Sequence, residues 1–205
     1  MMRHAFAAAA LLAAAPLAAQ STTQDDISAR YDRALAAGYK ALFLCSAIAN
    51  AERNGTTRTP GSVAAWELTG IQSPLDAVVH DLPYTIDRDS DGEIRQVVVE
   101  WAGDMPPRIA VHDSRRGCSQ LPIGGAPHPI RTKRPRINVE HGDSVVPVGA
   151  LSRSVEQAFG ETHGNGTLTT AVLVQRGGTV LGERYAPGFG PAVPQRTWSV
   201  AKSIA

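Results

Sequence analysis

The sequence predicts an α+β protein in which a helix-plus-strand module is followed by a second unit of one helix, one β-hairpin and a short helix. Three patterns lead to this prediction: a long stretch with helical spacing near the N-terminus, a series of short alternating segments separated by turns, and a later Gly-Gly bend between two strand-like runs. The chain has 205 residues and is 43% hydrophobic, which is ordinary for a folded protein.

The N-terminus has the layout of a secretory signal peptide. Arg3 and His4 precede an uncharged run rich in Ala and Leu, from Ala5 to Ala19, after which the chain becomes polar. A membrane span needs about 20 predominantly apolar residues, so the run is too short to cross the bilayer core. We expect residues 1–19 to be removed by cleavage near Ala19, and the protein to be exported to the periplasm or the medium without a stable membrane span.

Balanced charge argues against polyanionic partners. The chain has 20 Lys and Arg against 19 Asp and Glu, a formal net charge of +1, so neither nucleic acid nor an anionic membrane is expected as a partner. The densest basic stretch, residues 131–136, lies among prolines. We interpret residues 126–140 as a solvated linker rather than a polyanion-binding patch.

The first module is expected to span residues 20–125 and to open with a helix over residues 25–50, which Asp25 could cap. The apolar residues that define its predicted buried face are Ile27, Tyr31, Leu35, Leu42 and Phe43. A second, shorter helix is expected over residues 63–68.

Short strands are expected over residues 84–86, 96–101 and 108–112, with a hairpin bend at Asp91-Gly92. Asp87, Asp89 and Asp91 imitate the start of an EF-hand loop. The twelfth position is Val98, however, where a calcium loop needs a bidentate glutamate. A polar turn is therefore preferred, and no metal is predicted.

The second unit is expected over residues 141–205. Leu151, Val155 and Phe159 have helical spacing. Strands are expected over residues 170–175 and 180–185, joined by Gly177-Gly178. A Gly- and Pro-rich segment, residues 186–191, then leads to Thr197, which is a reasonable N-cap for a final helix.

The two cysteines, Cys45 and Cys118, are an even count in a chain expected to be exported. This favours one disulfide, and two buried free thiols are the alternative. Their separation and the scattered histidines argue against a metal site.

The final predicted helix carries Ser199-Val200-Ala201-Lys202, the sequence's only S-x-x-K. A serine and a lysine one helical turn apart can act as nucleophile and base. A lysine can accept the serine proton only if burial or a neighbouring positive charge lowers its pKa from about 10.4. The tetrapeptide is weak evidence alone, and an ordinary helix start with a solvated lysine is its alternative interpretation.

The context of this motif resembles a known family. LVQRGGTVLGERYAPGF followed by TWSVAKS is similar to the serine β-lactamase and penicillin-binding-protein superfamily, specifically to class C β-lactamase-related hydrolases that include esterases and 6-aminohexanoate-dimer hydrolases. The resemblance implies a β-lactamase/transpeptidase-like α/β sandwich. It further implies that Ser199 is acylated, that Lys202 is the general base, and that the backbone N–H of Ser199 is an oxyanion donor.

The family also uses Tyr-x-Asn (or Ser-x-Asn) and Lys/His-x-Gly elements downstream of the nucleophile, which this sequence lacks. We therefore expect an N-terminal part of a longer hydrolase, inactive and poorly stable as 205 residues alone. The implied substrate is a small-molecule or peptide-like amide or ester, and no cofactor is needed. Tyr185 is expected to pack rather than react. The alternative function is a non-catalytic periplasmic binding or interaction module that keeps the fold.

Overall fold

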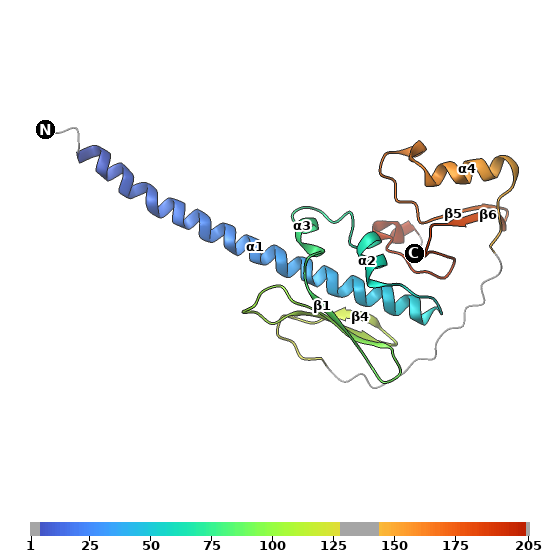
Figure 1. The fold of residues 1–205 in the computed structure, drawn as a ribbon, viewed down its shortest axis with the longest axis horizontal. Helices are drawn as coiled ribbons and strands as arrows, with labels where there is room; N and C mark the ends of the chain where they lie inside the picture. Colours follow the sequence, from blue (N-terminus) through green and yellow to red (C-terminus); the bar gives the residue numbers. More distant parts are fainter. Residues whose placement is uncertain (1–4, 128–143, 204–205) are drawn as a thin grey trace.

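The computed structural model describes residues 5–127 and 144–203, with side chains from Thr23 onward in the first range. The described chain is an α+β protein, as predicted. Figure 1 shows a long helix, α1, with a sheet on one side and two short helices on the other. The helices are α1 (Ala5–Arg53), α2 (Pro60–Trp66), α3 (Asp76–Val79), α4 (Gly149–Phe159) and the 3-10 helices η1 (Glu161–His163) and η2 (Trp198–Ser203). The strands are β1 (Tyr84–Arg88), β2 (Ile94–Val99), β3 (Arg108–Asp113), β4 (Gly117–Gln120), β5 (Ala171–Arg176) and β6 (Thr179–Tyr185).

Helix α1 begins much earlier than the sequence pattern predicted. It runs without a break from Ala5 to Arg53, so Asp25 lies in its interior and does not cap it. Ala and Leu, which are strong helix formers, make up most of residues 5–19 and favour this continuity, although Pro16 lies among them. Residues 5–19 of the predicted signal peptide (residues 1–19) form the first part of α1, and the expected cleavage would shorten this helix at its N-terminal end.

The predicted buried face of α1 is wrong in its first half. Ile27 is 56% exposed, Tyr31 is 64% exposed and Leu35 is 38% exposed. The buried face instead carries small residues from Ala34 onward, together with Leu44 and Ile48. These small residues let α1 lie close to the sheet: a Cβ on Gly38 would come within 2.5 Å of the Gln120 side-chain nitrogen, so that side chain would have to move.

The four strands β1 to β4 form an antiparallel sheet in sequence order. The three predicted strands are confirmed with small shifts in their ends, and β4 was missed because Gly117–Gln120 has no apolar alternation. Strand β2 contributes the centre of the core, where Ile94, Val97 and Val99 are buried against α1. The sheet and α1 therefore share one hydrophobic core.

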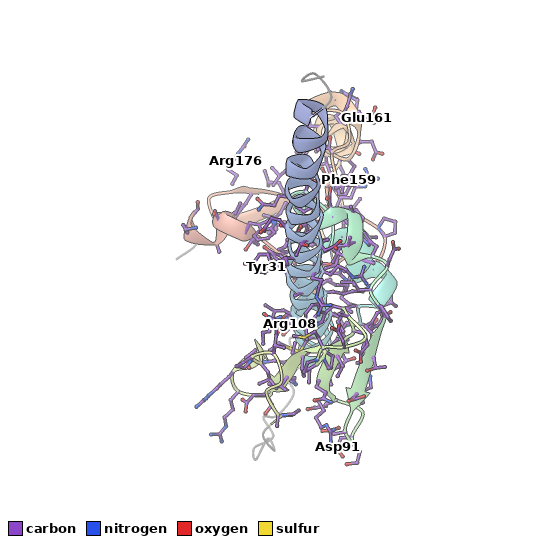
Figure 2. All side chains as sticks on the ribbon, turned by 90° about the vertical axis from the view of Figure 1, so that its left-hand side faces the viewer. Tyr31, Asp91, Arg108, Phe159, Glu161 and Arg176 are labelled. Carbon is purple, nitrogen blue, oxygen red and sulfur yellow. A yellow bond between two sulfur atoms is a disulfide. The ribbon has the colours of Figure 1, made fainter. Side chains whose placement is uncertain are left out.

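The predicted hairpin bend joins β1 and β2. Gly92 has a positive φ of 80°, and Asp89 Oδ1 accepts hydrogen bonds from the backbone N–H groups of Asp91 and Glu93. Asp87 Oδ2 accepts a hydrogen bond from Gln96. Figure 2 shows Asp91 at the tip of this hairpin, away from α1. Two of the three aspartates thus serve the local structure of the hairpin.

The second unit follows the predicted order of helix, hairpin and short helix. Helix α4 buries Val155 of its predicted face. Gly177 and Gly178 both have positive φ, 53° and 84°, which is the type I′ geometry of a two-residue hairpin turn. The predicted linker and its basic stretch lie outside the described residues, except for residues 126 and 127.

One described helical segment, Thr23–Arg53, has the length and apolar composition of a membrane span. However, 67% of its most apolar window is buried inside the protein. A core helix and a signal sequence share this signature with a true span. The contacts of α1 with β2, β3 and β4 are those of a core helix.

Candidate active site

Ser199 and Lys202 lie together on η2. Lys202 Nζ donates a hydrogen bond of 2.9 Å to Ser199 Oγ. The segment predicted as an α-helix is a 3-10 helix, in which the backbone N–H of Val200 donates to the carbonyl of Thr197 over 3.0 Å. Because this helix has three residues per turn, side chains at i and i+3 lie directly above one another. The S-x-x-K spacing thus brings the two side chains into contact.

Ser199 and Lys202 are both exposed. The residue before the serine, Trp198, has φ 47°, a left-handed conformation that is unusual for a bulky residue. Such a conformation persists only where the surrounding contacts determine it. The contacts of Trp198 therefore bear on where Ser199 lies.

The chain between β6 and η2, residues 186–197, packs against the first unit; we call it the docking segment. The Phe189 ring lies 4.9 Å from that of Trp66 in an edge-on arrangement. The carbonyl of Ala192 accepts hydrogen bonds from Asn54 (3.4 Å) and Thr56 (3.5 Å). These contacts hold the docking segment, which has no regular secondary structure, against α2 and the loop after α1.

A buried ion pair lies beneath the docking segment. The side chains of Arg58 and Glu67 are only 1% and 5% exposed, and Arg58 Nη1 donates to Glu67 Oε1 over 3.0 Å. Arg58 also lies over the Phe189 ring, 4.9 Å from its centroid, and donates to the carbonyl of Pro194 over 3.4 Å. One buried side chain thus contacts both α2 and the docking segment.

Arg196 makes the last contacts before η2. Its guanidinium donates to the carbonyls of Glu67 and Thr69, the latter at 2.8 Å from Nη2. It lies 5.5 Å from the Phe43 ring centroid and 4.7 Å from that of Trp198. Burial lowers the pKa of Arg196 from its ordinary value, while Glu67 acts in the opposite direction.

Trp198 completes an aromatic cluster with α1. Its ring centroid lies 6.4 Å from that of Tyr39 and 6.1 Å from that of Phe43. Tyr39 and Phe43 stack on each other at 5.6 Å. Aromatic pairs in this range attract one another beyond their burial. The start of η2 is therefore attached to α1.

Tyr185 donates a hydrogen bond of 2.7 Å to Glu183 Oε2. Burial, with help from Glu183, raises the pKa of Tyr185 to about 12. The phenol therefore keeps its proton at neutral pH and serves as a donor to Glu183. This placement agrees with the packing role expected for Tyr185.

Cys45 and Cys118 are joined by a disulfide that links α1 to β4. Cys45 lies on the buried face of α1, close in sequence to Tyr39 and Phe43. The bond therefore connects the sheet to the helix that contacts the docking segment. Within residues 5–127 and 144–203, no group of three or more His, Cys, Asp or Glu side chains could hold a metal ion.

Sequence reasoning found Ser199 and Lys202 but missed Arg58, Glu67 and Arg196. These three residues lie in loops or at a helix end, where no periodic pattern marks burial. No motif in the local sequence identifies them either. In comparisons with known proteins, no family model, no curated protein and no solved structure matches this chain.

Proposed function

We propose that this chain carries the nucleophile and general base of an exported serine hydrolase of the β-lactamase-related class. The substrate is an amide or ester, and catalysis proceeds through an acyl-enzyme at Ser199. The observation that supports this most directly is the 2.9 Å hydrogen bond between Lys202 Nζ and Ser199 Oγ. A nucleophile and its base must lie within this distance for proton transfer.

The chemistry assigned to the pair runs in two half-reactions. Ser199 Oγ attacks the substrate carbonyl carbon while neutral Lys202 Nζ takes the hydroxyl proton, and the carbonyl electrons move onto the oxygen. Collapse of this oxyanion breaks the C–N or C–O bond, and the Lys202 ammonium gives its proton to the leaving amine or alcohol. Water then attacks the acyl-enzyme with the same base and releases Ser199.

The order of elements supports the same proposal. Helix α4, the hairpin of β5 and β6, and η2 follow one another as the resemblance implies for the start of a β-lactamase-like domain. Export of the protein belongs to the proposal, and the Ala- and Leu-rich start of α1, residues 5–19, is compatible with a signal sequence. Because Ser199 and Lys202 are exposed here, the proposal requires downstream elements such as Tyr-x-Asn to cover them.

The test is covalent labelling of the full-length protein with a fluorophosphonate probe. We expect one labelled residue, Ser199, and no labelling of Ser199→Ala. The matched control is Ser203→Ala, which removes another exposed serine from η2 and should leave labelling unchanged. Lys202→Met should slow labelling by about 10²–10⁴-fold, the usual contribution of a general base.

Full-length protein that is folded but not labelled at Ser199 would overturn the proposal. The alternative, a non-catalytic binding module, would then be favoured. Labelling that survives in Ser199→Ala would likewise remove Ser199 from the mechanism.

A further inference from the structure

Arg196 connects three parts of the molecule near Ser199. Its guanidinium donates to the backbone carbonyls of Glu67, the C-cap of α2, and of Thr69 in the turn after it. The last carbonyls of a helix lack partners within the helix, and a cation is favoured near them. The planar guanidinium can donate to two carbonyls at once, which suits it to this position.

The remaining faces of Arg196 are covered by aromatic rings. The guanidinium carbon of Arg196 lies 5.5 Å from the centroid of the Phe43 ring on α1 and 4.7 Å from that of the Trp198 ring on η2. Trp198 in turn contacts Phe43 directly. Arg196 therefore holds the residue before the nucleophile against both α1 and α2.

The backbone of Trp198 explains why this matters for Ser199. Its φ of 47° determines the direction in which the chain enters η2. A tryptophan favours this conformation only when its ring is held by neighbours. The ring contacts with Arg196, Tyr39 and Phe43 supply that restraint.

We propose that Arg196 is a positioning residue for acylation of Ser199, acting through the carbonyls of Glu67 and Thr69 and through the Trp198 ring. The first unit then contributes to the reaction by setting where Ser199 Oγ lies, although it supplies no reacting group. This inference rests on the proposed function, because it concerns the rate at which Ser199 is acylated.

The experiment compares Arg196→Ala with Arg30→Ala in the full-length protein, using the fluorophosphonate probe. Arg30 is a matched control because it also lies over a tryptophan ring, 5.9 Å from the centroid of Trp101, and belongs to an exposed ion pair with Asp104. We expect Arg196→Ala to lower the labelling rate constant by about 10- to 100-fold, since displacement by about 1 Å can have such an effect. Arg30→Ala should label at the wild-type rate.

Two further measurements separate positioning from simple loss of stability. Persistent misfolding would leave a fraction of the molecules unlabelled, whereas positioning lowers the rate constant of folded protein while labelling still reaches completion. The pH profile of labelling should keep its shape in Arg196→Ala, because Arg196 is not the base. In protein carrying 5-fluorotryptophan, the ¹⁹F signal of Trp198 should shift in Arg196→Ala, and that of Trp101 in Arg30→Ala.

The outcomes distinguish this inference from the proposed function. If wild-type protein is labelled at Ser199 and Arg196→Ala labels as fast as Arg30→Ala, the positioning role is overturned and the hydrolase proposal stands. If the pH profile moves in Arg196→Ala, Arg196 acts on the base electrostatically, and positioning is again overturned. If wild-type protein is not labelled, the hydrolase proposal fails and the inference fails with it.

Discussion

Arg58 and Glu67 form an ion pair whose two side chains are almost completely removed from water, between the loop after α1 and the end of α2. Arg58 also donates to the docking segment at Pro194. The pair therefore lies where the first unit meets the chain that leads to Ser199, and its loss would leave one buried charge without its partner.

Replacing one partner of this pair should destabilise the protein strongly. Glu67→Leu leaves the Arg58 guanidinium buried and unpaired, which costs about 3–5 kcal/mol in the free energy of unfolding. The double variant Arg58→Met/Glu67→Leu should lose clearly less, because no charge remains buried. Urea denaturation followed by circular dichroism measures both, and a double variant as unstable as the single one would contradict this account.

The disulfide should contribute substantially to stability. Cys45 and Cys118 are 73 residues apart in sequence, and closing so long a loop in the unfolded chain contributes roughly 4 kcal/mol in the chain-entropy model. Reduction with dithiothreitol should lower the urea midpoint of the wild type. Cys45→Ala/Cys118→Ala should have a similarly low midpoint that dithiothreitol does not change. Equal midpoints for oxidised and reduced wild type would refute the prediction.

The two halves of α1 should respond differently to truncation of apolar side chains. Leu44 is fully buried in the core, so Leu44→Ala should cost about 2–5 kcal/mol. Ile27 is exposed, and Ile27→Ala should change stability by no more than about 0.5 kcal/mol. Thermal and urea unfolding test both variants. A large loss of stability in Ile27→Ala would instead support the buried face of α1 that the sequence pattern predicted.

Lys40 should make stability depend on pH in the alkaline range. Its ammonium is buried on α1 and donates to the carbonyls of His80 (2.7 Å) and Leu82 (2.8 Å). Burial lowers the pKa of Lys40 below its ordinary 10.5, and Asp81 partly opposes this shift. Between the lowered pKa and 10.5, the unfolded chain binds more protons than the folded one. The free energy of unfolding should therefore rise with pH across that interval.

The variant Lys40→Met should lack this rise, which is measured as the wild-type minus variant difference in unfolding free energy at several pH values. Arg33→Met is the control, because it removes another α1 side chain that donates to a backbone carbonyl, that of Trp101, without removing a lysine. A difference between wild type and Lys40→Met that stays constant with pH would contradict the prediction.

Local patterns predicted the elements that depend on local physics. Short runs rich in β-branched residues between turns predicted β1, β2 and β3, because such residues favour the extended backbone of a strand. Gly177-Gly178 predicted the bend of the second hairpin, since only glycine adopts positive φ there at no steric cost. The spacing of Ser199 and Lys202 predicted their contact, which holds although η2 is a 3-10 helix and not the expected α-helix.

Other features of the molecule depend on which surfaces meet. The buried face of α1 was predicted from its large apolar residues, but close packing on the sheet selects alanines and Gly38 instead. Nothing in the local sequence marks Arg58, Glu67 or Arg196, because their burial results from the docking of an irregular segment on α2. The sequence by itself thus determined the main strands and the Ser199/Lys202 spacing. Only the tertiary structure decided which side chains surround the Ser199/Lys202 pair. Burial of residues in loops depends on the surface against which the loop packs, and it leaves no periodic pattern in the sequence.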